Sequence, residues 1–262
     1  MQGSLGEKIG EGAVSDVHDW APGQVVKLFK AGIPEQLIRY EARVTRAVFA
    51  AGAPAPEVFD EVTLEGRFGI VLGRLDGPTL FQLSRSGALT LEQTGAILAS
   101  LCLSVHRTPP PQEVPFLRDF MRVSLMRVSM LSGGSVPEHI VTGVLALIER
   151  LRPGDGLCHA DLHPGNVIMT ADGPKIIDWA CTFRAPAVFG IGRAHVTLSE
   201  LVPEDADPER PRAINAAMQS EYARLAGISP AKLRRRCSRT CLPSTPSSSS
   251  SSGRPPLPSG SR

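Results

Sequence analysis

Three polar residues in one short stretch have the types and spacing needed to activate a hydroxyl beside a metal ion. Asp161 is followed by Asn166, and Asp178 comes directly after an apolar run. A carboxylate can orient a hydroxyl group and accept its proton. A second carboxylate and an amide are hard oxygen ligands of the kind that Mg²⁺ prefers. The stretch therefore predicts a site for phosphoryl transfer to a hydroxyl.

A hairpin is the element that must bring these side chains together. Residues 167–169 and 175–177 have the pattern of two apolar strands, and a Thr-Ala-Asp-Gly turn joins them, which is a hairpin signal. Asn166 enters the first strand and Asp178 leaves the second, so the two should face the same space. Asp161 lies on the loop just before them.

The residues around this hairpin resemble a known family. The run His159-Ala160-Asp161-Leu162-His163-Pro164-Gly165-Asn166, followed by Ile176-Ile177-Asp178-Trp179, is similar to the aminoglycoside phosphotransferase family, which includes choline and homoserine kinases. The resemblance implies Asp161 as catalytic base and His163 as a supporting catalytic residue. It also implies Asn166 and Asp178 as Mg²⁺ ligands, and ATP as the phosphoryl donor. It extends over most of residues 5–200.

The first part of the chain contains residues where the resemblance places the ATP site. Lys27 lies on a β-rich run and Glu41 on a predicted helix, Pro34–Ala50. The resemblance implies that the lysine holds the ATP phosphates and pairs with the glutamate. Taken alone, a strand lysine is usually a solvated edge residue and a helix glutamate a surface charge.

Two glycine-bearing segments complete the predicted nucleotide site. The pattern Gly10-x-Gly12-x-x-Ser15 would form a loop over the phosphates, because small residues let backbone N–H groups approach closely. On its own this pattern indicates an ordinary turn equally well. Residues 69–77 resemble the hinge, where backbone groups from Gly73 to Leu75 would bind adenine.

The order of the elements predicts an α+β protein with the two-lobed, protein-kinase-like fold. Residues 1–75 favour a small β-rich lobe with one helix, which would bind the nucleotide. Residues 76–230 favour a larger, mainly helical catalytic and substrate lobe, with helices expected at 92–107, 116–131 and 137–151. The final segment, 231–262, is rich in Ser, Pro and Arg and is predicted to be disordered.

Charge and composition narrow the partners and the location. Residues 1–230 carry 21 basic and 26 acidic residues, whereas the tail carries seven basic residues and no acidic one. A nucleic-acid-binding body would show the reverse, so no nucleic-acid partner is expected, although a basic arm for RNA or membranes stays an alternative for the tail. The absence of a long apolar run and of a secretory start predicts no membrane association. The five scattered cysteines favour a cytoplasmic protein.

The acceptor is the least determined part of the prediction. The residues Glu204, Asp205, Asp207 and Glu209 form an acidic cluster that would suit a cationic acceptor, such as an aminoglycoside, or would cap the next helix. We therefore predict only a small molecule that carries a hydroxyl group.

Two departures from the family pattern keep other functions open. Ala160 replaces the usual glycine, and residues 179–199 contain no Asp or Glu, with Gly190 near the position where the family has an acid. This favours, as an alternative, a weak or inactive kinase-like binding module. A second alternative is a metal-dependent hydrolase, in which His159, Asp161 and His163 would bind zinc.

Overall fold

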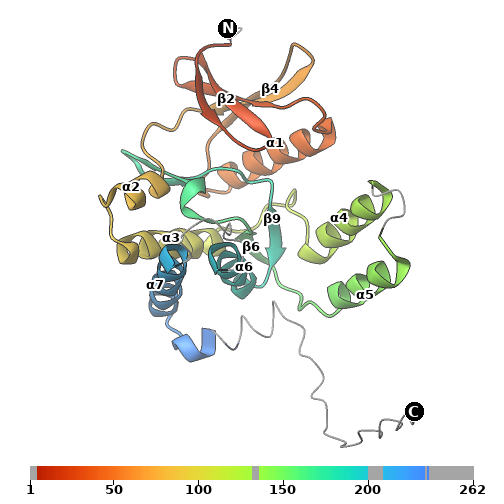
Figure 1. Ribbon diagram of the computed structural model, residues 1–262, viewed down its shortest axis with the longest axis vertical. Coiled ribbons are helices and arrows are strands. Elements are labelled where there is room, and N and C mark those ends of the chain that lie inside the picture. The colour runs from red at the N-terminus through yellow and green to blue at the C-terminus, as the bar shows by residue number, and fades with distance from the viewer. Residues whose placement is uncertain (1–4, 132–135, 200–208, 234, 236–262) are drawn as a thin grey trace, which may run out of the picture.

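The computed structural model describes residues 5–131, 136–199, 209–233 and 235, and it has two lobes (Figure 1). The first lobe is a five-stranded antiparallel sheet with one helix against it. Its strands follow the order β1-β2-β3-β5-β4. Its elements are β1 (Lys8–Glu11), β2 (Ser15–Ala21), β3 (Gln24–Phe29), α1 (Glu35–Ala50), β4 (Val58–Leu64) and β5 (Arg67–Gly73).

The second lobe is mainly helical and contains two small sheets, in which β6 pairs with β9 and β7 pairs with β8. Its helices are α2 (Leu80–Ser86), α3 (Leu91–Arg107), α4 (Leu117–Leu131), α5 (Glu138–Glu149), α6 (Ala187–Ser199) and α7 (Glu209–Leu225). Its strands are β6 (Gly156–His159), β7 (Val167–Thr170), β8 (Gly173–Ile176) and β9 (Thr182–Ala185), with the short 3₁₀ helix η1 (Pro164–Asn166) before β7.

This architecture confirms the predicted α+β, protein-kinase-like fold class. The predicted hairpin is β7–β8, and the helices expected in both lobes are present, whereas α2, β9 and α6 were not predicted. The lobe boundary near residue 75 stays a prediction, as does the disorder of the tail, which lies almost entirely outside the described residues. Within the described part of the chain, no helix is long and apolar enough to cross a membrane.

Helix α1 carries one buried acid among apolar residues. Ile38, Ala42, Thr45 and Val48 are buried. Ile38 and Ala42 pack with residues of the sheet, and Val48 belongs to the core cluster that extends into the second lobe. Glu41 lies on the same side and is only 6% exposed. Burying an unpaired carboxylate is costly, so this position requires a partner from the sheet.

The β7–β8 hairpin joins the two lobes through backbone hydrogen bonds. The Ile176 N–H donates to the carbonyl of Pro54 in the first lobe, at 2.7 Å, and the Met169 N–H donates to Pro78 in the linker, at 2.9 Å. Gly77 has a φ of 151°, and a Cβ there would lie 2.0 Å from the Met169 carbonyl oxygen. Only glycine fits this crossing. The hairpin that carries the site residues is thus held from both sides.

Helices α3 and α7 form the centre of the second lobe. At Gly95 an added Cβ would lie 2.5 Å from the Ala217 Cβ and 2.7 Å from the Ile214 carbonyl oxygen, so the two helices touch backbone to backbone. Further along, the His106 Nδ1 lies 2.8 Å from the Tyr222 hydroxyl, and burial lowers the pKa of His106 to about 4. This histidine is therefore neutral in the folded protein at pH 7.

We expect the free energy of unfolding to fall as the pH is lowered from 6.5 towards 4. In this range the unfolded chain protonates His106 and the folded chain does not, which favours unfolding. The pKa difference predicts a loss of about 2 kcal/mol between pH 7 and pH 4.5. Urea unfolding at both values should show this loss in the wild type. In His106→Gln the pH dependence should shrink by that amount, and an unchanged dependence would contradict the assignment.

Candidate active site

The loop between β6 and η1 holds Asp161 in a fixed position. The Asn166 amide nitrogen donates to the Asp161 backbone oxygen at 3.0 Å and to its Oδ2 at 3.3 Å. Asn166 is buried, whereas the Asp161 side chain is 38% exposed. The His163 Nε2 lies 3.9 Å from Asp161 Oδ2, and its Nδ1 accepts a hydrogen bond from Gly165 N–H. The carboxylate is thus oriented but still reachable, as a general base requires.

The buried His159 is hydrogen-bonded to this loop and to the end of the β7–β8 hairpin. His159 Nδ1 accepts from the Asp161 N–H and its Nε2 donates to the Ile177 carbonyl, both at 3.3 Å. Burial lowers the pKa of His159, so the ring is neutral. Since both ring nitrogens are engaged, His159 has no lone pair for a metal. In the described ranges, no group of three or more His, Cys, Asp or Glu side chains could hold a metal ion.

Asp178 has an unusual backbone conformation at the end of the hairpin. Its φ is +64°, in the left-handed region that non-glycine residues seldom adopt, at a cost of about 1 kcal/mol or more. On one side, the Ile177 N–H donates to the Asn166 carbonyl at 2.9 Å; on the other, the Trp179 Nε1 donates to the Ile176 carbonyl at 2.8 Å. These bonds hold the strained residue in place.

Lys27 of β3 joins the acids of the two lobes. Its Nζ lies 2.6 Å from Glu41 Oε1 and 3.6 Å from Asp178 Oδ1. Burial lowers the pKa of Lys27, but the Glu41 and Asp178 carboxylates raise it by more, so the net shift is upward. The lysine is therefore charged, and Glu41 has found the partner that its burial requires.

The glycine-bearing turn lies beside this lysine. In the sheet, Val17 is paired with Gly10 on one side and with Lys27 on the other. Directly opposite residues share a face of the sheet, so Gly10 and Lys27 lie on the same face. The Gly12 N–H donates to the Ser15 carbonyl at 2.8 Å, which closes the turn, and Ser15 is buried.

The hinge segment offers fewer free donors than the sequence suggested. The Gly73 N–H donates to Glu57 at 2.8 Å, and the Arg74 N–H donates to Gly23 at 2.9 Å. Among the described residues, none accepts a hydrogen bond from the Leu75 N–H. Of the predicted adenine contacts, Leu75 is therefore the available donor, and Gly73 has only its carbonyl to offer.

The donor set fits Mg²⁺ and a nucleotide. The Asn166 amide nitrogen is committed to Asp161, so its oxygen is the atom with ligand character. Together with the Asp178 carboxylate this gives two hard oxygen ligands next to the Lys27 ammonium group. Mg²⁺ in phosphoryl-transfer sites usually takes only one or two protein side chains, and phosphates and water complete its shell. The predicted metal residues thus have suitable chemistry and neighbours.

Two functional contacts were missed from the sequence. The Ala160 N–H donates to the Cys181 carbonyl at 2.8 Å, and the Arg193 Nε donates to the Ala160 carbonyl at 3.3 Å. Both brace the residue before Asp161. The two arginines of the acid-free stretch, Arg184 and Arg193, were the only available signal. Gly190 has no room for a side chain, because a Cβ there would lie 2.5 Å from His106 Nε2.

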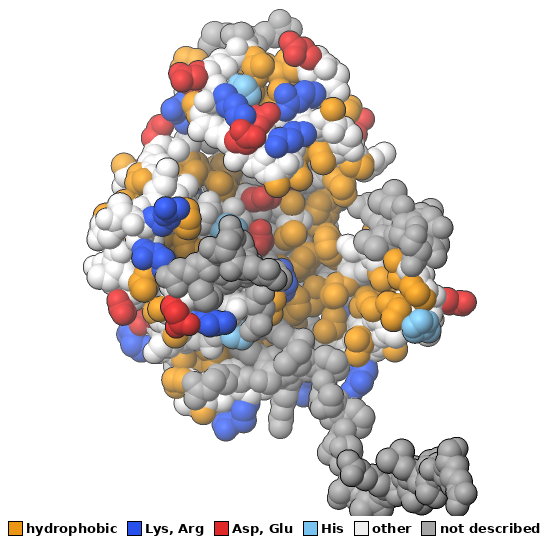
Figure 2. Space-filling view, viewed as in Figure 1, with side chains coloured by type: hydrophobic (Ala, Val, Ile, Leu, Met, Phe, Trp, Pro, Cys, Tyr) orange, Lys and Arg blue, Asp and Glu red, His pale blue; other side chains and the backbone are white. Residues whose placement is uncertain are grey.

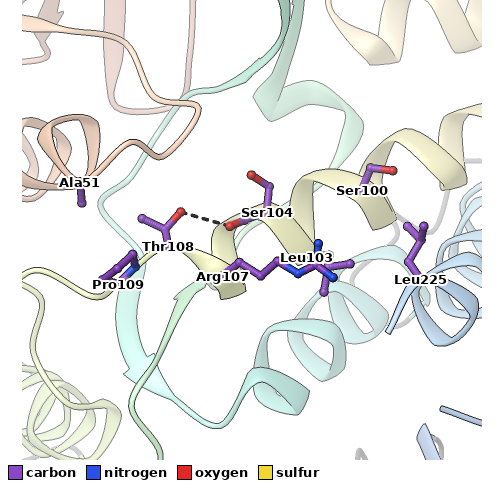
Figure 3. A pocket seen from close by; sticks show the side chains of 8 residues that line it. All are labelled: Ala51, Ser100, Leu103, Ser104, Arg107, Thr108, Pro109 and Leu225. Carbon is purple, nitrogen blue, oxygen red and sulfur yellow. Dashed lines mark hydrogen bonds between the residues drawn. The ribbon is translucent and has the colours of Figure 1, made fainter. Parts of the chain in front are cut away.

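A separate open pocket, of about 490 Å³, lies along α3 and away from these residues (Figure 3). Its lining residues are Ala51, Ser100, Leu103, Ser104, Arg107, Thr108, Pro109 and Leu225. The Thr108 hydroxyl donates to the Ser104 carbonyl at 3.1 Å. The lining contains one charged side chain, that of Arg107, and no acidic or basic group that could act together with this arginine. We therefore assign the pocket no function.

Known proteins resemble this chain in sequence pattern and in fold. Residues 11–228 match the model of the phosphotransferase enzyme family. An aminoglycoside-3'-phosphotransferase of type VIII is similar over 90% of this chain and 91% of its own, with a TM-score of 0.58 and 21% identity.

A choline/ethanolamine kinase family protein from Mesorhizobium loti is similar over 90% of this chain and 74% of its own, with a TM-score of 0.56 and 17% identity. The ADP-bound aminoglycoside phosphotransferase APH(2'')-Ib is similar over 89% and 81%, with a TM-score of 0.51 and 15% identity. At these identities the likeness shows the fold. No curated protein matches the sequence.

Proposed function

Because this chain belongs to the phosphotransferase enzyme family, we propose that it is a small-molecule kinase that moves the γ-phosphoryl group of ATP to a hydroxyl group. The observation that carries the proposal is the position of Lys27 Nζ, 2.6 Å from Glu41 and 3.6 Å from Asp178. Lys27 thus connects strand β3, near the glycine turn, with Asp178, the proposed metal ligand of the second lobe. ADP in a structure of the same fold supports ATP as the donor.

Asn166 and Asp178 would hold Mg²⁺, and Lys27 would contact the phosphates of ATP. When bound, Mg²⁺-ATP supplies the phosphoryl group and offsets negative charge during transfer. Because Gly10 and Gly12 have no side chains, the turn that contains them would approach the phosphates closely. The Leu75 N–H would bind adenine at the hinge. We expect the reaction to take place in the cytoplasm, where ATP is available.

Asp161 would act on the acceptor. Its carboxylate orients the acceptor hydroxyl and takes the proton as the oxygen attacks. Asn166 prevents this carboxylate from turning away, through the bond to Oδ2 at 3.3 Å. His163 supports the same oxygen from 3.9 Å. The acceptor is a small hydroxyl-bearing molecule, and the acidic cluster that would favour a cationic one lies largely outside the described residues.

The experiment that tests this proposal is Mg²⁺-dependent ATP consumption across a panel of aminoglycosides, amino alcohols and sugars. Acceptor-dependent turnover that requires Mg²⁺ and is lost in Asp161→Asn would support the kinase. Binding of ATP without turnover for any acceptor would overturn it in favour of the inactive binding module.

A further inference from the structure

One peptide group, between Ala160 and Asp161, carries the proposed base. Its carbonyl oxygen accepts a hydrogen bond from Arg193 Nε at 3.3 Å, and its N–H donates to His159 Nδ1 at the same distance. His159 ends β6, the strand that leads into this loop, whereas Arg193 comes from α6, later in the chain. Rotation of this peptide group would turn the Asp161 carboxylate, so the two side chains that hold it affect where the base points.

Helix α6 packs against β6, and Arg193 lies about one helical turn beyond their closest approach. A Cβ at Gly190 would lie 2.5 Å from His106 Nε2 and 3.6 Å from Cys158 Sγ, so α6 has no room for a side chain at that position. Residues three apart lie on the same side of a helix, which places Arg193 on the side that faces the loop. Where the family pattern has an acid near position 190, this helix contacts the loop through an arginine.

The positive charge of Arg193 acts on the same place as the proposed catalytic acids. Burial raises the pKa of the Cys181 thiol, the charges of Asp161 and Asp178 raise it further, and the charge of Arg193 lowers it. The thiol is thus close enough to respond to the arginine and to both acids. Figure 2 shows acidic side chains in the hollow between the two lobes. Since an arginine side chain never loses its proton in a protein, Arg193 is a permanent cation beside this acidic centre.

The carbonyl that Arg193 binds requires a donor because it is buried. Ala160 is only 2% exposed. A buried carbonyl that loses its donor is destabilised, and a charged donor makes a stronger hydrogen bond than a neutral one. Without Arg193, the peptide group before Asp161 would therefore gain free energy by rotating towards water or another donor.

We propose that Arg193 is a positioning residue for phosphoryl transfer. Its charged hydrogen bond to the Ala160 carbonyl fixes the peptide group that carries Asp161, and in this way it aims the carboxylate at the acceptor hydroxyl. This inference rests on the proposed function. Arg193 takes no part in the proton transfer, because the hydroxyl proton passes to Asp161 and the guanidinium stays charged.

Three single variants separate positioning from a general structural role. Arg193→Met removes the donor and the charge, and Arg193→Lys keeps a charged donor on a side chain of similar reach. Arg184→Met is the matched control. Arg184 is the other arginine of the acid-free stretch, and it also donates to backbone carbonyls, those of Val114 at 3.0 Å and Pro111 at 2.7 Å, which lie outside the loop of Asp161.

In Arg193→Met we expect kcat to fall about 10- to 100-fold, because a small displacement of a catalytic group has an effect of this size. The KM for ATP should stay within about twofold, since the lost interaction does not involve the nucleotide. Arg193→Lys should recover part of the kcat. Arg184→Met should lower the melting temperature but leave kcat within about threefold of the wild type. Equal losses of kcat in Arg184→Met and Arg193→Met would overturn the proposal.

A double variant tests whether Arg193 acts through Asp161. In Asp161→Asn the base is already lost, so adding Arg193→Met should lower kcat by less than about threefold more. If the second substitution caused the same loss in this background as in the wild type, Arg193 would act independently of Asp161 and the proposal would be wrong.

Amide hydrogen exchange provides a measurement that does not depend on turnover. In Arg193→Met the N–H groups of Ala160 and Asp161 should exchange about tenfold faster or more, relative to the amides of α3, because the loop opens locally. Arg184→Met should show no such local change. Unchanged exchange in Arg193→Met would overturn the proposal even if kcat fell. If the wild type turns over no acceptor, the proposed function fails, and the exchange rates alone decide whether Arg193 holds this loop.

Discussion

Replacing Asp161 with Asn should lower kcat by about 10²–10⁴-fold while ATP binding persists, because a positioned general base contributes that much to such a reaction. The change is nearly isosteric, and the side-chain oxygen of the introduced asparagine can still accept the hydrogen bond that Asn166 makes at 3.3 Å. The geometry of the loop should therefore survive. Initial rates with saturating Mg²⁺-ATP and acceptor measure the loss.

Asp172→Asn is the matched control for this prediction. Asp172 is exposed in the turn of the β7–β8 hairpin, and the substitution removes the same charge from the same segment. It should leave kcat within about twofold of the wild type, since a surface change away from the site usually has little effect. If Asp161→Asn also stayed within tenfold of the wild type, Asp161 would not be the base.

Replacing Lys27 with Met should destabilise the protein by about 3–5 kcal/mol, in addition to abolishing turnover. The Glu41 side chain is 8% exposed and lies 2.6 Å from Lys27 Nζ, so the variant leaves a buried carboxylate without its partner. Adding Glu41→Leu removes that carboxylate. The double variant should regain most of the lost stability but none of the activity. Urea unfolding and ATP turnover on the four proteins of this cycle separate the two roles of the pair.

Lys30→Met provides the matched control on the same segment of chain. Lys30 lies 3.7 Å from Glu11, and both side chains are well exposed, at 41% and 61%. An exposed pair of this kind contributes little to stability, so stability and turnover should hardly change. If Lys27→Met lowered the free energy of unfolding as little as Lys30→Met does, the buried Glu41 carboxylate would not require Lys27 as its partner.

The residues of the catalytic hairpin could be predicted because their contacts are local. Asn166 and Asp178 are brought together by one short turn, so their spacing and the apolar runs between them are sufficient to place them. The helix that carries Glu41 was predictable for the same reason, since its apolar residues recur with the helical period.

Other contacts could not be predicted because they join segments far apart in the chain. Strand β9 has only four residues and exists through its pairing with β6. Its apolar Phe183 and the brace from Arg193 to the loop follow from that pairing and from the packing of α6. The lack of an acid at position 190 was visible in the sequence. The sequence could not show that the His106 ring occupies the space beside Gly190.

The sequence by itself determined the family of chemistry, the hairpin residues and the order of the lobes, because short-range spacing and periodicity encode them. Tertiary structure alone decided that Lys27 meets both Glu41 and Asp178, that His159 is closed to metal, and which apolar residues of α4 are buried. Apolar residues occur around much of helix α4, so its periodicity cannot say which of them are buried. Packing of Leu117, Phe120 and Met121 on the cluster around the β6–β9 sheet makes that choice.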